Sequence, residues 1–205
     1  MKDTTTVVPE GNEVKTTFAP SRFKKRLMEF VDDSRSSMSV VYSLLALQPN
    51  LIAHLLRVAN NISKPTTIKG IIAALGSDRI AEQLKCVSDA PPEEAISLRL
   101  DAIKSYIVAR VFAALAEKEI GKQYAPEFFL VGLLHKIFEE DTELLEDCNA
   151  ELIRCFKGEG APNWPKVAKA CELVETFRTK DCGHDTLYLV WKDANRSVRA
   201  GLNGF

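Results

Sequence analysis

The stretch LLALQPNLIAHLLRVANNISKPTTIKGIIAALGSDRI, residues 44–80, indicates the fold because its apolar spacing and its breakers outline consecutive helices. Pro49 stands where a helix tolerates proline, in the first turn. Apolar residues then recur at helical intervals up to two asparagines that end the helix: Leu51, Ile52, Leu55, Leu56, Val58 and Ala59, before Asn60 and Asn61. Lys64-Pro65 marks a turn, Thr67 can cap the next helix, and Gly76 suits the left-handed position at its end.

The same periodicity continues on both sides of this stretch. It predicts further helices over residues 21–31, 36–47, 77–86, 93–119, 127–138, 144–156, 164–177 and 186–191. Gly132, inside the most apolar of them, predicts close approach by a neighbouring helix. Residues 1–20 lack an apolar period, so we expect a flexible tail there and one helical domain over 21–205. The expected fold class is all-α, with nine or ten helices and no significant β-sheet.

The composition of the chain limits the kinds of partner that it could bind. The chain has 205 residues, and 27 basic against 28 acidic side chains leave a formal charge of -1. No global field therefore draws it to nucleic acid or to acidic lipid. Its five cysteines form no C-x-x-C pair, which favours reduced thiols in the cytoplasm. No stretch has the length and apolarity of a signal peptide or a membrane span, so we expect no membrane contact.

Histidines are too few and too scattered to suggest a metal centre by themselves. His54 lies within an amphipathic helix and is expected at the edge of the core. His184, beside Cys182 and Asp185, has no second pair of ligands at a suitable spacing. From these residues we expect neither a metal nor a cofactor.

The third histidine lies in a more informative context. FLVGLLHKIF, residues 129–138, resembles the His-Asp motif of the HD superfamily of metal-dependent phosphohydrolases, with Lys136 in place of the aspartate after His135. LRLDAIKSYIVARVFAALAE, residues 98–117, is similar to the helix that supplies a partner histidine in that superfamily, with Lys104 at the histidine position. An ammonium group has no lone pair to offer a cation, so these two lysines disfavour metal binding.

Residues 44–80 sharpen this likeness, because they are similar to the HD-related output domain, HDOD. The residues that stand as this family would have them include Pro49, Arg57, Asn60, Gly76 and Arg79. The resemblance covers residues 36–140 by motif, and the C-terminal helices only by order and size. Each of these residues also has an ordinary structural use, and Asn60 is expected to act as a cap or a backbone clamp.

The resemblance implies a non-catalytic regulatory domain of bacterial signal transduction. Such a domain would act by binding a protein partner, which the sequence does not identify, or by forming a homo-oligomer. The alternative is a divergent HD-type phosphohydrolase or nucleotide phosphodiesterase. A cleft that retains Lys104, His135 and Lys136 could instead bind an anion such as a nucleotide phosphate without turnover.

DNA binding is a weaker alternative. The segment around Gly76 has two short helices joined by a turn, which is the outline of a helix-turn-helix unit. Its second helix offers only Arg79, Gln83 and Lys85 to a duplex, and Asp78 and Glu82 oppose them. We therefore do not expect nucleic acid as a partner.

Overall fold

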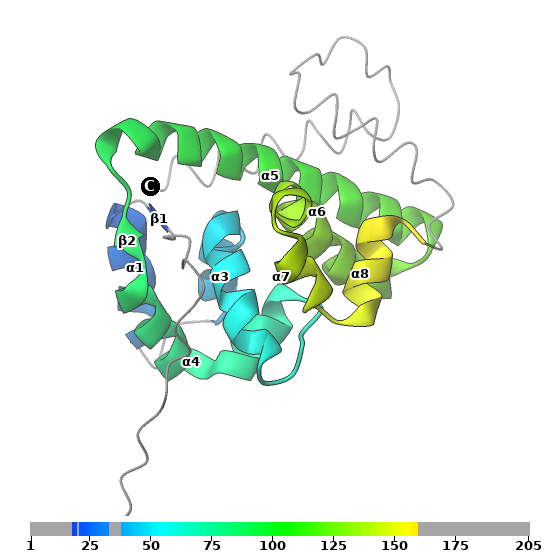
Figure 1. Ribbon diagram of the computed structural model, residues 1–205, viewed down its shortest axis with the longest axis horizontal. Coiled ribbons are helices and arrows are strands. Elements are labelled where there is room, and N and C mark those ends of the chain that lie inside the picture. The colour runs from blue at the N-terminus through cyan, green and yellow to red at the C-terminus, as the bar shows by residue number, and fades with distance from the viewer. Residues whose placement is uncertain (1–17, 20, 33–37, 160–205) are drawn as a thin grey trace, which may run out of the picture.

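Residues 18–19, 21–32 and 38–159 are described by the computed structural model, and about four fifths of them are helical (Figure 1). This confirms the all-α prediction for the described part of the chain. The helices expected over 164–177 and 186–191 lie outside the described residues, as does the tail expected over residues 1–20 except for Phe18–Ala19.

The first four helices follow the sequence predictions closely. They are α1 (Ser21–Asp32), α2 (Met38–Leu45), α3 (Pro49–Asn60) and α4 (Ile68–Cys86). The side chain of Thr67 caps α4 by accepting a hydrogen bond of 3.0 Å from the amide of Gly70. Gly76 has φ 69° and ψ 171°, which no helix contains, and it bends α4 into two segments. The positive φ expected at Gly76 is therefore confirmed.

Two short strands tie the start of the described chain to the end of α4. β1 (Phe18–Ala19) pairs in parallel with β2 (Ser88–Asp89), and Phe18 lies opposite Ser88. Lys24 on α1 strengthens this connection by donating a 2.6 Å hydrogen bond to the carbonyl of Val87. Phe18–Ala19 were expected in the flexible tail but belong to this ordered contact, because pairing with β2 satisfies their backbone groups.

The second half of the described chain is organised by one long helix. α5 (Pro92–Glu119) runs across the molecule above the other elements in Figure 1, and α6 (Ala125–Glu140) packs along it after the 3-10 turn η1 (Lys122–Tyr124). A Cβ at Gly132 would lie 2.8 Å from the Cα of Ala109 and 3.0 Å from the Phe112 ring. The close approach expected at Gly132 is therefore confirmed, and it sets the spacing of α5 and α6.

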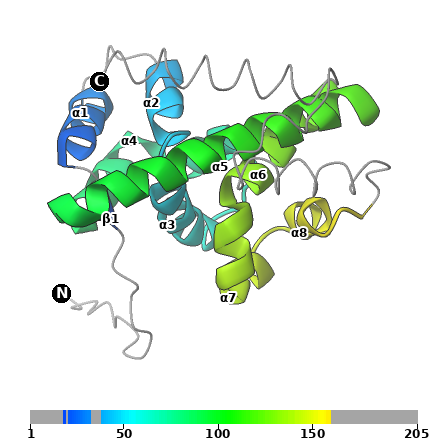
Figure 2. The same ribbon diagram turned by 90° about the horizontal axis from the view of Figure 1, so that it is seen from above.

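One predicted helix is divided. The apolar stripe from Leu144 to Phe156 predicts a single helix, but the chain forms α7 (Thr142–Glu146) and α8 (Ala150–Lys157). The break follows from the cap of α8, because the side chain of Asn149 accepts a hydrogen bond from the amide of Glu151. This cap begins a new helix axis, so the single-helix prediction was wrong. Figure 2 shows the two axes pointing in different directions.

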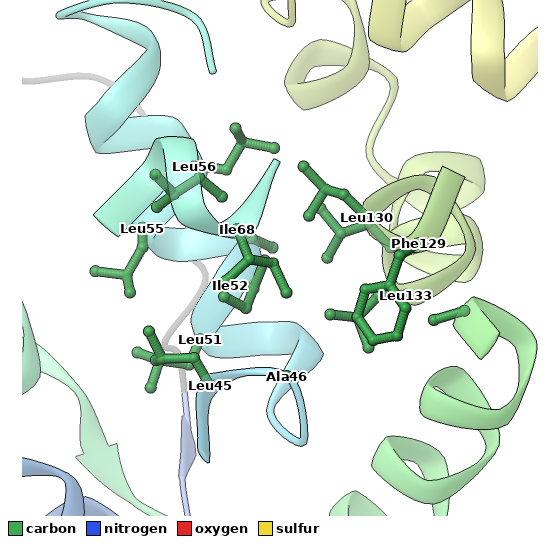
Figure 3. Packing of buried hydrophobic residues seen from close by; sticks show 14 of the residues in the cluster. Leu45, Ala46, Leu51, Ile52, Leu55, Leu56, Ile68, Phe129, Leu130 and Leu133 are labelled. Atoms are coloured by element: carbon green, nitrogen blue, oxygen red, sulfur yellow. The ribbon is translucent and has the colours of Figure 1, made fainter. Parts of the chain in front are cut away.

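The core lies where the two halves meet. Figure 3 shows apolar side chains of α2, α3 and α4 facing those of α6. The largest buried side chains on the N-terminal side include Leu45, Leu51, Ile52, Leu55, Leu56 and Ile68. From α6 come Phe129, Leu130 and Leu133. Burial of this continuous apolar surface is the main force that joins the halves into one body.

Among the described helices, none is by itself long and apolar enough to cross a bilayer. Ser39–Leu45 and Pro49–Asn60 reach that length only together, and a bend of 113° separates them.

Candidate functional site

His135 lies on α6 in a cluster of aromatic rings. Its ring centroid is 5.7 Å from that of Phe112 on α5 and 5.3 Å from that of Phe156 on α8, and Phe138 packs on the same Phe156 ring. Its Nδ1 lies 3.6 Å from a carboxylate oxygen of Glu139, one turn further along α6. The imidazole therefore fills the space between α5, α6 and α8, where it contributes packing.

Lys136 points to a different part of the molecule. It lines a cavity of about 200 Å³ between the start of α3 and the facing turns of α5 and α6. Asp101 and Glu140 line the same cavity and place two carboxylates beside its single ammonium group. Ser105 belongs to this cavity, whereas the neighbouring Lys104 is not among the lining residues. Of the three residues predicted for an anion site, this cavity is lined by Lys136 and not by Lys104 or His135, and its lining carries a negative balance of charge.

Ligands for a metal do not converge in this region. Within residues 18–19, 21–32 and 38–159, no three His, Cys, Asp or Glu side chains are arranged to hold a metal ion. His54 is half-buried on α3, and its Nε2 lies 2.9 Å from the side-chain oxygen of Gln83 on α4. Burial lowers the pKa of His54, so the ring is neutral at physiological pH and joins two helices at the edge of the core, as expected. His184 lies outside the described residues.

Arg57 and Asn60, two residues of the HDOD-like motif, lie in a polar seam that joins the end of α3 to α7. Arg57 forms an ion pair with Asp141, the residue that also caps α7. Lys64, just beyond α3, pairs with Asp147 at 3.1 Å. We call these contacts, together with the one between Asn60 and Cys148, the α3–α7 seam. The sequence motifs assigned no role to Asp141, although the spacing from Asp141 to Leu144 is that of a helix cap.

Asn60 differs from its predicted role. The capping hydrogen bond at the end of α3 comes from Asn61, whose side-chain amide donates to the carbonyl of Arg57 at 3.2 Å. Asn60 is 5% exposed, and its amide nitrogen lies 3.8 Å from the Cys148 sulfur. It therefore clamps a side chain of the neighbouring segment and not the backbone of its own helix.

Of the remaining motif residues, Pro49 and Gly76 serve the fold, and Arg79 lies on the surface. Pro49 is buried at the first turn of α3, and Gly76 forms the bend in α4. Arg79 is exposed on the second segment of α4. Arg79 is accompanied there by the exposed acids Asp78 and Glu82, so this surface has mixed charge.

Two thiols in the described chain are sheltered from reaction. Burial raises the pKa of both Cys148 and Cys155 to about 11, and nearby carboxylates act in the same direction. A thiol with such a pKa holds almost no thiolate at neutral pH and is a poor nucleophile. Cys86 is exposed on the last turn of α4.

A second cavity has no counterpart in the sequence predictions. It has a volume of about 370 Å³ and lies between η1, the first turns of α6, and α8. Tyr124 and Phe128 form its aromatic wall, while Glu151, Arg154 and Glu159 surround its opening. The residues come from three separate segments, and no sequence motif connects them. Only the exposed tyrosine just before a buried helix could have drawn attention to this cavity.

Comparison of the chain with protein families, with characterised proteins and with solved structures finds no match.

Proposed function

We propose that this chain is a non-catalytic regulatory domain of the HDOD type, which acts by binding another protein. The observation that carries the proposal is that the side chains of His135 and Lys136 lie against different parts of the molecule. This pair stands where an HD phosphohydrolase would hold its metal. His135 is packed between Phe112 and Phe156, and Lys136 lies in the cavity with Asp101 and Glu140. A hydrolytic site needs ligands that converge on one cation, and this pair faces two different neighbours.

The resemblance to HDOD indicates the process and the kind of partner that the proposed domain would have. It supports a role in bacterial signal transduction in the cytoplasm, with a signalling protein as the partner or with self-association of the domain. The structural use of Arg57 and Asn60 agrees with a motif retained for the scaffold, since both residues join α3 to α7.

Metal content and hydrolysis together test the proposal against the alternative phosphohydrolase. The full chain is purified without chelator, its metal content is measured, and phosphodiester and phosphomonoester hydrolysis is assayed with added Mn²⁺. We expect less metal than protein and the same background rate in the wild-type chain and in His135→Phe, a variant that keeps an aromatic ring in the cluster. Stoichiometric metal, with turnover that His135→Phe abolishes, would contradict the proposal.

Nucleotide binding without turnover is tested by melting. Because Lys136 shares its cavity with Asp101 and Glu140, we expect nucleoside triphosphates and cyclic dinucleotides to leave the melting temperature of the chain unchanged. An increase that disappears in Lys136→Gln would show that this cavity accepts an anion.

A further inference from the structure

The cavity between η1, α6 and α8 combines an aromatic wall with acidic groups. Tyr124 is 39% exposed and lies beside the buried ring of Phe128. Glu151 and Glu159 are exposed at the opening. Aromatic faces and carboxylates are the two kinds of group that bind a guanidinium or an ammonium ion, through cation–π and charge-assisted contacts.

A third carboxylate lies close to this cavity. Glu127 precedes Phe128 in the first turn of α6, and its Oε2 is buried without a hydrogen-bond partner. The charges of Glu127 and Glu151 both raise the pKa of the Cys155 thiol, which lines the cavity, so both carboxylates act on the same wall. Glu127 does not line the cavity, so its charge adds to the negative field there without being a direct contact.

Arg154 is the single basic residue among those that line the cavity. It offsets one of the two lining carboxylates, Glu151 and Glu159, so the site keeps a negative balance. The net negative charge of the cavity would repel an anionic ligand. A cationic side chain with an apolar stem matches both the aromatic wall and the acidic opening.

We infer that this cavity is the docking site for an arginine or lysine side chain of a partner protein, which inserts between Tyr124 and the carboxylates of Glu151 and Glu159. The inference rests on the proposed function, since it identifies the surface through which the domain would recognise its partner. The inserted side chain would place its stem against Phe128 and its charged end at the acidic opening. Partner recognition should then weaken as salt is raised, because the carboxylates at the opening are exposed.

A matched pair of peptides tests the inference. Acetyl-Gly-Arg-Gly-amide and its citrulline analogue, which has nearly the same shape but no charge, are titrated into the isotopically labelled full chain, and amide chemical shifts are followed by NMR. We expect the arginine peptide to shift the amides of Tyr124, Phe128 and Arg154, with a dissociation constant of roughly millimolar size, as suits one inserted side chain. The citrulline peptide should leave them in place.

Variants distinguish this cavity from general charge attraction. The double variant Glu151→Gln with Glu159→Gln should weaken binding of the arginine peptide about tenfold, because two exposed ion pairs are lost. Tyr124→Ala should weaken it severalfold through loss of the aromatic face. The control Glu143→Gln with Glu146→Gln removes the same charge from two exposed positions of α7 and should bind like the wild-type chain.

The inference would be overturned by equal shifts with both peptides, by no shift at a peptide concentration of about 20 mM, or by shifts confined to other parts of the molecule. The last result would leave the proposed docking function standing and move it to another surface. Concentration-dependent shifts of the same amides without peptide would also overturn it, because a second copy of the chain would then occupy the cavity. Metal-dependent hydrolysis would refute the proposed function without changing the peptide result, so the two failures are distinguishable.

Discussion

At the scale of single residues, Gly132 determines how closely α5 and α6 approach. The neighbours that an added Cβ would meet are the backbone of Ala109 and the buried ring of Phe112, and neither can move without displacing α5. We expect Gly132→Ala to lower the free energy of unfolding by about 1–3 kcal/mol through overpacking, even though alanine favours helix more than glycine does. Urea denaturation measures this change.

The control for this variant is Lys69→Ala, at an exposed helical position of α4, which should change stability by less than about 0.5 kcal/mol. If Gly132→Ala were as stable as the wild-type chain, the close approach of α5 and α6 would have no energetic importance.

The buried thiols of Cys148 and Cys155 make stability depend on pH in the alkaline range. Each pKa is raised from 9.0 to about 11 in the folded chain. Between these values the unfolded chain releases a thiol proton that the folded chain keeps, so stability falls as pH rises from 9 to 11. The loss should reach about 2 kcal/mol for each thiol. It is measured as the unfolding free energy at a series of pH values.

Substitutions show which thiol causes the decrease in stability between pH 9 and 11. Cys148→Ala should flatten the decrease in stability above pH 9, whereas Cys86→Ala, at an exposed cysteine, should leave it as in the wild-type chain. Burial also raises the pKa of Tyr42, which adds to the decrease in all three proteins and therefore cancels in the comparison. Equal slopes in Cys148→Ala and the wild-type chain would disprove the contribution of this thiol.

At the scale of elements, the α3–α7 seam holds the division between α6 and α7 in place. Asp141 has two separate functions there, because one of its oxygens caps α7 and the other pairs with Arg57. We expect Asp141→Ala to lose both functions and about 1–2 kcal/mol of stability. Asp141→Asn keeps the capping oxygen, so it should lose only the ion pair, which is worth less than about 1 kcal/mol at a half-exposed arginine.

Denaturation of Arg57→Ala, alone and combined with each Asp141 variant, completes the comparison. The arginine change should add little to Asp141→Asn, since the pair is already broken in that variant. Full additivity of Arg57→Ala and Asp141→Asn would mean that the two side chains do not interact.

The elements that the sequence predicts well are those whose signals are local. The cap at Thr67, the positive φ of Gly76 and the close contact at Gly132 all follow from residue types and spacing. The division of α7 from α8 was missed because the apolar stripe crosses it without interruption. Only the cap at Asn149 reveals the break, and a single polar residue between apolar positions is too common to stand out.

The candidate site was harder to predict, for the same physical reason. His135 and Lys136 are adjacent in the sequence, and a family motif treats them as one unit, yet adjacent residues on a helix point about 100° apart. Which neighbour each one meets depends on the packing of α5, α8 and α3. The cavity around Tyr124 depends on three distant segments, so only the folded chain brings it together.

At the scale of the whole molecule, the two ends of α5 differ in how firmly they are held. Apolar spacing continues along the helix, but Leu100 is 50% exposed, whereas Ile107, Ala109 and Phe112 are buried against the rest of the core. The buried half packs along α6, and both share the core with α3 (Figure 1). Backbone hydrogen bonds open locally where few apolar contacts hold them, and only with global unfolding where the core does.

Native-state hydrogen exchange should therefore divide α5 into two parts. We expect amides over residues 107–116 to exchange at the rate of global unfolding, together with those over 129–134 of α6, and those over 94–101 to exchange at least about tenfold faster. The comparison lies within one continuous helix, so the contrast reports tertiary packing and not the presence of helix. Added denaturant should narrow the difference in exchange rate between the two parts of α5, because it promotes global unfolding more than local opening. Uniform protection from one end of α5 to the other would mean that contacts in addition to the described core hold its first turns.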